Sequence, residues 1–129
     1  MKRVIRTDRA PAPFQGAPYS QAVVHGDLVF VAGQIGIDPA TNEVVEGGIE
    51  AQTAQAMENV GAILAEAGTS FENILKASIF IVDFTDFPAL NEVYARYVGP
   101  DFPARATVQI AGLPSGALVE IEVVASTQP

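Results

Sequence analysis

One arginine and two glutamates stand out among the side chains of this sequence that could bind or transform a small molecule. Arg105 follows Pro103 and opens a predicted strand, while Glu120 and Glu122 lie on the last predicted strand. Residues 10–129 contain only three basic side chains, Arg105 among them, against fourteen acidic ones, a net charge of −11. A guanidinium directed by a rigid preceding turn, in so acidic a chain, favours a pocket for a small carboxylate, which its planar fork binds with two parallel hydrogen bonds.

Each of these residues also has a structural interpretation, and the sequence alone leaves the choice open. Arg105 would serve equally well in an ion pair at a subunit interface. Glu120 and Glu122 would then be the solvent-facing half of a strand. Tyr19 follows Pro18 in a loop, where it either closes a pocket or packs as an ordinary aromatic residue.

The residue inventory disfavours thiol and metal chemistry. The chain has no cysteine and a single histidine, His25, which precedes a Gly26-Asp27 turn. Disulfides, thiolate nucleophiles and Cys-ligated metals are therefore excluded. Without a second histidine a zinc site would depend on carboxylates, which is unusual, so we expect no metal and interpret His25 as a surface residue.

Length and composition fit a single domain spanning residues 1–129. A chain of 129 residues buries about two thirds of the surface that its unfolded form exposes, enough for a core. The net charge of −8, with four of seven basic residues in the first nine positions, disfavours nucleic-acid binding. No apolar run approaches the roughly 20 residues of a membrane helix, and the basic N-terminus lacks the features of a signal or transit peptide. We expect a cytoplasmic protein with neither nucleic-acid nor membrane partners.

The N-terminal third of the chain is predicted to form strands. Residues 2–6, 20–25 and 28–32 are interpreted as strands, with Gly26-Asp27 as the turn between the last two. Gly33 and Gly36 then interrupt the third strand. Two glycines at this spacing indicate either a plain bulge or a close approach of the backbone to a ligand or another chain.

Two helices and a central strand are predicted to follow. Apolar residues recur at helical spacing over residues 49–67, and residues 74–84 form an apolar run typical of a strand covered on both faces. Asp86 is predicted to cap a second helix, because its carboxylate can accept from the free amides of the next turn. Judged alone, Phe87 is interpreted as a core residue and Asn91 as a surface polar group. The apolar face of this helix comprises Leu90, Val93, Tyr94 and Tyr97.

The last two predicted strands, residues 107–111 and 117–125, are predicted to pair as a hairpin around a turn at residues 113–116. Alternation gives each strand one polar face. The hairpin is therefore expected to bring together Arg105, Thr107, Gln109, Glu120 and Glu122.

This order of elements indicates an α+β fold with a mixed sheet packed on two helices. One face of such a sheet stays uncovered and would carry valine and isoleucine beside the polar residues named above. We therefore expect the chain to associate with copies of itself.

The sequence resembles the RidA family, also called YjgF/YER057c/UK114, whose archetype is a 2-iminobutanoate/2-iminopropanoate deaminase. The resemblance spans nearly the whole chain. Its main motif comprises Pro103-Ala104-Arg105-Ala106-Thr107-Val108, Ala111-Gly112-Leu113 and Val119-Glu120-Ile121. Supporting matches are Ala17-Pro18-Tyr19-Ser20-Gln21, Ala32-Gly33-Gln34-Ile35, Asn59-Val60, Asp86-Phe87 and Leu90-Asn91-Glu92-Val93-Tyr94.

The resemblance implies a chorismate-mutase-like fold assembled as a homotrimer with pockets between subunits. It implies cofactor-free hydrolysis of the enamines and imines released by pyridoxal-phosphate dehydratases, giving 2-oxo acids and ammonia, a form of metabolite damage control. In the family the arginine matching Arg105 binds the substrate carboxylate and the glutamate matching Glu120 positions or activates water. The other residues implied to surround the ligand are Tyr19, Gly33, Phe87, Asn91 and Thr107. A buried Glu120 would hold its proton more tightly, with Arg105 opposing that shift.

Three positions depart from the family pattern. Ala32 stands where many members have Ser or Thr, Thr107 where the archetype has Cys, and Ala17 where Gly is usual. Ala32 and Thr107 keep open a second class of function, a noncatalytic member that binds small carboxylates in the same clefts. A chaperone-like activity is also attributed to the family. A ribonuclease activity, also attributed to the family, fits the −11 charge of residues 10–129 least well.

Overall fold

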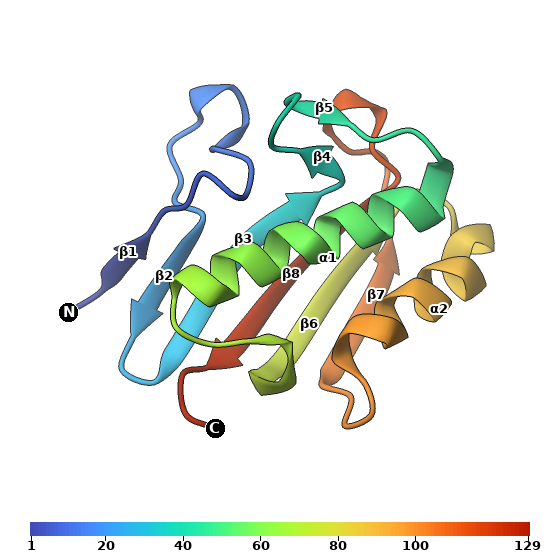
Figure 1. Cartoon of the computed structure of the whole chain (residues 1–129). Helices are drawn as coiled ribbons and strands as arrows, with labels where there is room; N and C mark the ends of the chain where they lie inside the picture. The colour runs from blue at the N-terminus through green and yellow to red at the C-terminus, as the bar shows by residue number, and fades with distance from the viewer.

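A six-stranded mixed sheet carries two helices on one of its faces, in a computed structural model that describes residues 1–129 (Figure 1). The α+β architecture predicted from the sequence is confirmed. The sheet has the strand order β1-β2-β3-β8-β6-β7. Its strands are β1 (Arg3–Ile5), β2 (Ala22–His25), β3 (Leu28–Ile35), β6 (Ile74–Ile81), β7 (Ala104–Gln109) and β8 (Val119–Ser126). The helices are α1 (Gly48–Glu66) and α2 (Phe87–Val98), and a small separate hairpin comprises β4 (Ile37–Asp38) and β5 (Glu43–Val44).

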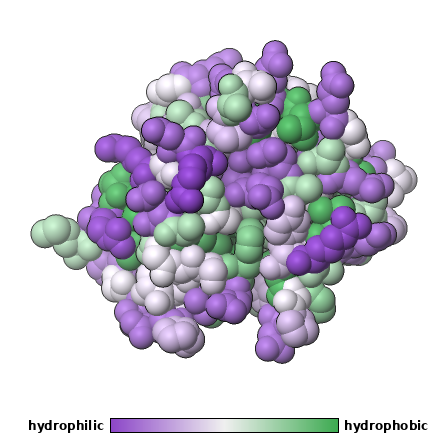
Figure 2. Space-filling model, viewed as in Figure 1, coloured by the Kyte–Doolittle hydropathy of each residue, from purple (hydrophilic) through white to green (hydrophobic).

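Helix α1 lies across the middle of the sheet and α2 lies beside it, over the β6 and β7 end (Figure 1). The predicted helical periodicity holds, because Met57, Val60 and Leu64 are fully buried against the sheet. They meet Ile121 and the other inward residues of β8 in one core cluster of 23 residues. Hydrophilic residues predominate on the outer surface of this helical side, among scattered apolar ones (Figure 2). None of the helices combines the length and hydrophobicity needed to cross a bilayer.

The predicted pairing of the last two strands is wrong. β7 and β8 are not neighbours, because β6 lies between them, parallel to β7 and antiparallel to β8. The reason is the connection through α2: a strand followed by a helix returns parallel to its starting strand, so β7 pairs with β6.

The intervening strand places Arg105 and Glu120 on opposite faces of the sheet. Arg105 pairs with Ala77, a fully buried residue under the helices. Glu120 pairs with Phe80, which alternates onto the other face. The predicted single cluster of Arg105, Thr107 and Gln109 with Glu120 and Glu122 therefore does not form within one chain.

The face of the sheet away from the helices is open and partly apolar, as predicted. Phe30 and Val108 are each 46% exposed there, and Leu28 is 38% exposed. They belong to β3 and β7, so the apolar surface extends over much of the sheet. A monomer rarely leaves so many large apolar side chains on one face without a partner.

The predicted capping role of Asp86 is also wrong. Asp86 does stand just before α2, but its side chain makes no capping hydrogen bond. A short 3₁₀ helix, Phe84–Asp86, runs directly into α2, so the helical run begins one turn earlier. Asp83 caps that start, accepting from the Thr85 amide at 2.8 Å and the Thr85 hydroxyl at 2.8 Å. The backbone hydrogen bond, then the hydroxyl one, lower the pKa of Asp83.

Candidate functional site

One cleft, of about 370 Å³, lies where the N-terminal loop meets the ends of β3 and β8. It collects three of the residues that the sequence singled out, Tyr19, Gly33 and Glu120, together with Ala32. The remaining wall is mostly apolar and includes Pro11, Phe14, Ala17, Ile35, Ile37 and Pro114. The cleft is therefore largely apolar and is lined by one carboxylate and one phenol together with the amides of Gln34 and Asn42, a common composition for a small-molecule site.

Gly33 is required by the approach of Glu120. The β3 to β8 register shifts between Val31 and Gln34, so the predicted bulge is present. A Cβ atom added at Gly33 would lie 2.7 Å from Cδ and 3.0 Å from Oε1 of Glu120. The bulge is thus confirmed, and the group that approaches the Gly33 backbone is the Glu120 side chain of the same chain, so any larger residue would displace the carboxylate.

Glu120 is an acid that retains its proton more readily than a free glutamate. Burial raises its pKa, and the negative charge of Glu122 raises the pKa further. The expected opposition from Arg105 is absent within one chain, because that guanidinium lies on the other face of the sheet. A carboxyl group poised in this way can exchange a proton with a ligand or a water in the cleft.

The turn that precedes Tyr19 is hydrogen bonded to the Tyr19 hydroxyl and places this side chain at the cleft. Gln15 and Gly16 take left-handed φ values of 52° and 68°, and the amide of Ala17 donates to the carbonyl of Phe14 at 3.0 Å. Tyr19 Oη then accepts from the amide of Phe14 at 2.7 Å. The turn therefore fixes both the ring and the hydrogen-bonding state of its hydroxyl.

A second group of predicted residues surrounds Arg105 on the helical side of β7. Its guanidinium donates to Asn91 Oδ1 at 2.6 Å and lies 5.4 Å from the ring centre of Phe87. The ring of Tyr94 lies 5.0 Å away. Phe87, Asn91 and Tyr94 are spaced by four and then three residues, so one face of α2 forms a cradle of two cation–π contacts and one hydrogen bond.

Tyr94 was not predicted as a site residue, although its place on the apolar face of α2 was. The helical spacing from Phe87 and Asn91 is the signal that would have identified it. Tyr94 is only 4% exposed and its buried hydroxyl has no hydrogen-bond partner. Burial raises the pKa of Tyr94, with the positive charge of Arg105 acting in the opposite direction.

Thr107 lies two residues beyond Arg105 on the same face of β7, and its hydroxyl is likewise buried without a partner. A cavity of about 380 Å³ opens beside the cradle, bounded by Asn91, Tyr94, Phe102, Pro103 and Arg105 among others. Gln109, by contrast, is occupied within the fold, accepting from the amide of Phe84 at 2.8 Å.

The candidate residues thus form two half-sites on opposite faces of the sheet. The acid half-site contains Tyr19, Gly33 and Glu120, and the anion half-site contains Phe87, Asn91, Tyr94, Arg105 and Thr107. One chain does not bring the halves together.

Comparisons with known proteins give a consistent result. The family model described as endoribonuclease L-PSP matches residues 8–127. The 2-iminobutanoate/2-iminopropanoate deaminase of Capra hircus is 44% identical over 129 residues, covering 100% of this chain and 93% of that protein.

Solved structures share the fold at similar identity. RidA from the Antarctic bacterium Psychrobacter has a TM-score of 0.91 and 44% identity, covering 96% of this chain and 98% of that one. TdcF of Escherichia coli, solved with bound serine, has a TM-score of 0.90 and 38% identity, with the same coverage of 96% and 98%.

Proposed function

The chain belongs to the endoribonuclease L-PSP family, which includes RidA, and from this premise we propose that it hydrolyses reactive 2-imino acids to 2-oxo acids and ammonia. Relatives named 2-iminobutanoate/2-iminopropanoate deaminase, at 43–44% identity over the whole chain, support a hydrolytic deaminase role. The substrates would be the enamines and imines released by pyridoxal-phosphate-dependent dehydratases.

The observation that carries the proposal is the division of the site into two half-sites. Arg105 can hold a carboxylate and Glu120 can manage a proton, but the sheet separates them in one chain. We propose that a homotrimer joins the anion half-site of one subunit to the acid half-site of the next. Closed rotational symmetry makes such a head-to-tail contact at every interface, and the exposed Phe30 and Val108 supply apolar surface for it.

Each half-site has a distinct role in the proposed reaction. Arg105, aligned by Asn91, holds the substrate carboxylate with parallel hydrogen bonds. Glu120 positions a water molecule against the imine carbon and accepts one of its protons as the oxygen bonds to that carbon. The second electron pair of the carbon–nitrogen double bond moves to nitrogen, which takes the proton from Glu120 to give a carbinolamine. The hydroxyl of this intermediate then gives its proton through Glu120 to nitrogen, the carbon–nitrogen bond breaks as the carbonyl forms, and ammonia and the 2-oxo acid leave. Orientation and a single acid–base group suffice, because imine hydrolysis is already a facile reaction.

The family description also names a ribonuclease, which this chain is poorly equipped to be. Residues 10–129 carry three basic and fourteen acidic side chains, a net charge of −11. Binding to a phosphate backbone requires clustered Lys and Arg. Arg105 is held by one hydrogen bond and two aromatic rings. These contacts surround a single guanidinium and do not form a basic surface.

Imine turnover in a coupled assay tests the proposal. A threonine or serine dehydratase generates the imine, semicarbazide competes for it, and formation of the 2-oxo acid is followed with and without the purified protein. We expect acceleration by the wild type and a loss of about 100-fold in Arg105→Ala, equivalent to about 2.7 kcal/mol. Arg96→Ala is the matched control, because Arg96 only forms an exposed ion pair with Glu92 at 3.2 Å on the outer side of α2.

A binding protein for small carboxylates is the second candidate, favoured by the bound serine in the TdcF structure. The same cradle around Arg105 would hold the carboxylate of an amino acid without turnover. Arg105-dependent binding of serine or of a 2-oxo acid, combined with no acceleration for any small 2-imino acid, would favour this candidate over the deaminase.

A further inference from the structure

Gln21 is a buried polar residue that the proposed reaction does not use directly. Its side chain is 4% exposed, yet it makes four hydrogen bonds to main-chain groups. Gln21 Oε1 accepts from the amide of Thr7 at 2.7 Å, and Nε2 donates to the carbonyl of Thr7 at 3.0 Å. Nε2 also lies 2.8 Å from the carbonyl of Pro11 and 3.3 Å from that of Ala10. The Gln21 side-chain amide therefore pairs with the main chain of Thr7 in the way that a neighbouring strand would. The same amide also holds the loop after Thr7 through the carbonyls of Ala10 and Pro11.

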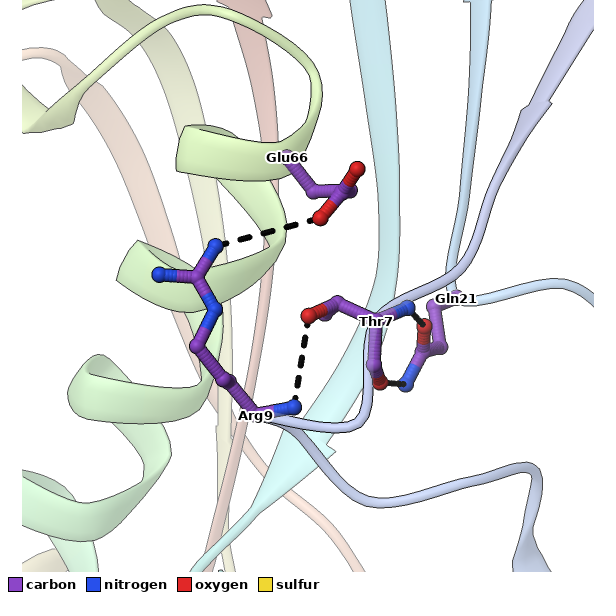
Figure 3. A network of polar contacts seen from close by, with 4 residues as sticks. All are labelled: Thr7, Arg9, Gln21 and Glu66. Carbon is purple, nitrogen blue, oxygen red and sulfur yellow. Dashed lines mark hydrogen bonds and ion pairs between the residues drawn. The ribbon is translucent and has the colours of Figure 1, made fainter.

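The network around Gln21 fixes the N-terminal segment, residues 7–11, to the sheet (Figure 3). The main-chain carbonyl of Gln21 accepts a hydrogen bond from the amide of Ala32 at 2.9 Å, and Ala32 lines the acid half-site. The segment is also attached by Ala10, which is 3% exposed and belongs to the main core cluster, and by an ion pair between Arg9 and Glu66 on α1 at 3.8 Å, with side chains 64% and 46% exposed. Exposed ion pairs of this kind contribute little, so Gln21 is the main polar attachment of the segment.

The fixed segment leads directly to Tyr19. The segment ends at Pro11 and the chain continues to Phe14, and both residues form part of the cleft wall. The Phe14 amide donates to Tyr19 Oη at 2.7 Å. A phenol has one hydrogen to donate, lying close to the ring plane in one of two directions. Because the Phe14 amide occupies one direction, the hydroxyl hydrogen of Tyr19 takes the other.

We propose that Gln21 is a positioning residue that, through residues 7–11 and the Phe14 amide that follows them, holds the Tyr19 hydroxyl as a hydrogen-bond donor to the ligand in the cleft. The inference rests on the proposed deaminase for its rate measurements. It assigns to Tyr19 a donor role and to Gln21 an indirect one, acting through the main chain rather than by touching the substrate.

A double-mutant cycle on kcat/KM tests this coupling. Tyr19→Phe keeps the ring and removes the donor, and we expect a loss of about 5- to 10-fold, the value of one neutral hydrogen bond. Gln21→Ala should lose about as much on its own, but less than a further twofold in the Tyr19→Phe background, because it acts through a hydroxyl that is already gone. Gln21→Glu provides a second variant that retains the acceptor for the Thr7 amide if the alanine variant does not fold.

A matched control separates positioning from stability. Thr69 also ties a loop to the sheet, since its hydroxyl donates to the carbonyl of Ser126 at 2.6 Å, but it lies outside the residues of both half-sites. Thr69→Ala should lower the unfolding temperature and leave kcat/KM within twofold of the wild type. If Gln21→Ala instead lowers kcat/KM by the same factor in the Tyr19 and Tyr19→Phe backgrounds, the proposed coupling is refuted.

A measurement without turnover distinguishes failure of this inference from failure of the deaminase. Amide hydrogen exchange by NMR should show the Phe14 amide protected in the wild type, and exchanging at least tenfold faster in Tyr19→Phe and in Gln21→Glu. If the wild type does not turn over imines, the same cycle is measured on the Kd of 2-oxobutanoate, where the donor should give the same non-additivity. A Phe14 amide that exchanges freely in the wild type overturns the inference whatever the activity.

Discussion

Two inactive variants should restore activity to each other when their subunits are mixed. Arg105 and Glu120 lie on opposite faces of the sheet, so the proposed complete site takes one from each of two subunits. Arg105→Ala and Glu120→Gln should each lose about 100-fold alone, since each removes one charged partner of the reaction. A mixed trimer, however, contains one interface at which both residues are intact.

The size of the recovery follows from the symmetry of the assembly. Random association of equal amounts of the two variants gives mixed rings in about three quarters of trimers, and each mixed ring has one intact site out of three. The mixture should therefore show about one quarter of the wild-type rate per subunit. The variants are unfolded together, refolded and assayed with the dehydratase coupling, and native mass spectrometry counts the mixed trimers.

A control pair makes the result unambiguous. Arg105→Ala mixed with Asn91→Ala places both changes in the anion half-site, where Asn91 bonds to Arg105, so mixing should give only the mean of the two separate rates. If mixed trimers of Arg105→Ala and Glu120→Gln form without any recovery of activity, then the site is not shared between subunits and the proposed arrangement is wrong.

Three further changes test single contacts. Gly33→Ala, whose Cβ would lie 2.7 Å from Cδ of Glu120, should lower kcat by about tenfold or more, whereas Gly112→Ala, with no atom within 4 Å, should leave it unchanged in the same assay. Asn91→Ala removes the 2.6 Å bond that aligns Arg105 and should raise KM by about 5- to 10-fold with a smaller change in kcat. Burial raises the pKa of Glu120, so the folded state binds its proton more tightly than the unfolded state, and stability is lost as pH rises from the unfolded towards the folded pKa. In an Arg105→Ala background, Glu120→Gln should therefore raise the unfolding temperature at pH 8 but not at pH 4, and an equal rise at both values would contradict this assignment.

The elements of the fold were predictable where the pattern of one segment decided the outcome. Met57, Val60 and Leu64 recur at helical spacing, which predicts that they share one face of a helix. All three are buried in the core, as expected. The alternation of Arg105 and Thr107 along β7 was likewise correct, because side chains on a strand alternate whatever its partners.

The pairing of strands was not predictable from such patterns. Alternation shows which residues of a strand share a face. It does not show which strand is the neighbour, or which residues of the other strands lie on the same face of the sheet. A short turn between residues 113 and 116 favoured a hairpin, whereas the path through α2 makes β7 the parallel partner of β6. That one long-range choice moved Arg105 to the face opposite Glu120.

The two half-sites also differ in how the chain builds them, and this difference bears on their function. The anion half-site is local, since one face of α2 and the strand that follows it supply the cradle around Arg105. The acid half-site is assembled from distant parts of the sequence, with Tyr19, Gly33 and Glu120 meeting at the bulge of β3.

Both half-sites are nevertheless already formed within one chain. The guanidinium of Arg105 has its hydrogen bond and its aromatic neighbours, and the carboxyl of Glu120 has the space left by Gly33. Docking of subunits would then have to order few additional side chains, which lowers the entropic cost of association and of substrate binding. Assembly, in the arrangement we propose, completes a site whose parts are preorganised, and catalysis depends on the contact between subunits rather than on a rearrangement within any one of them.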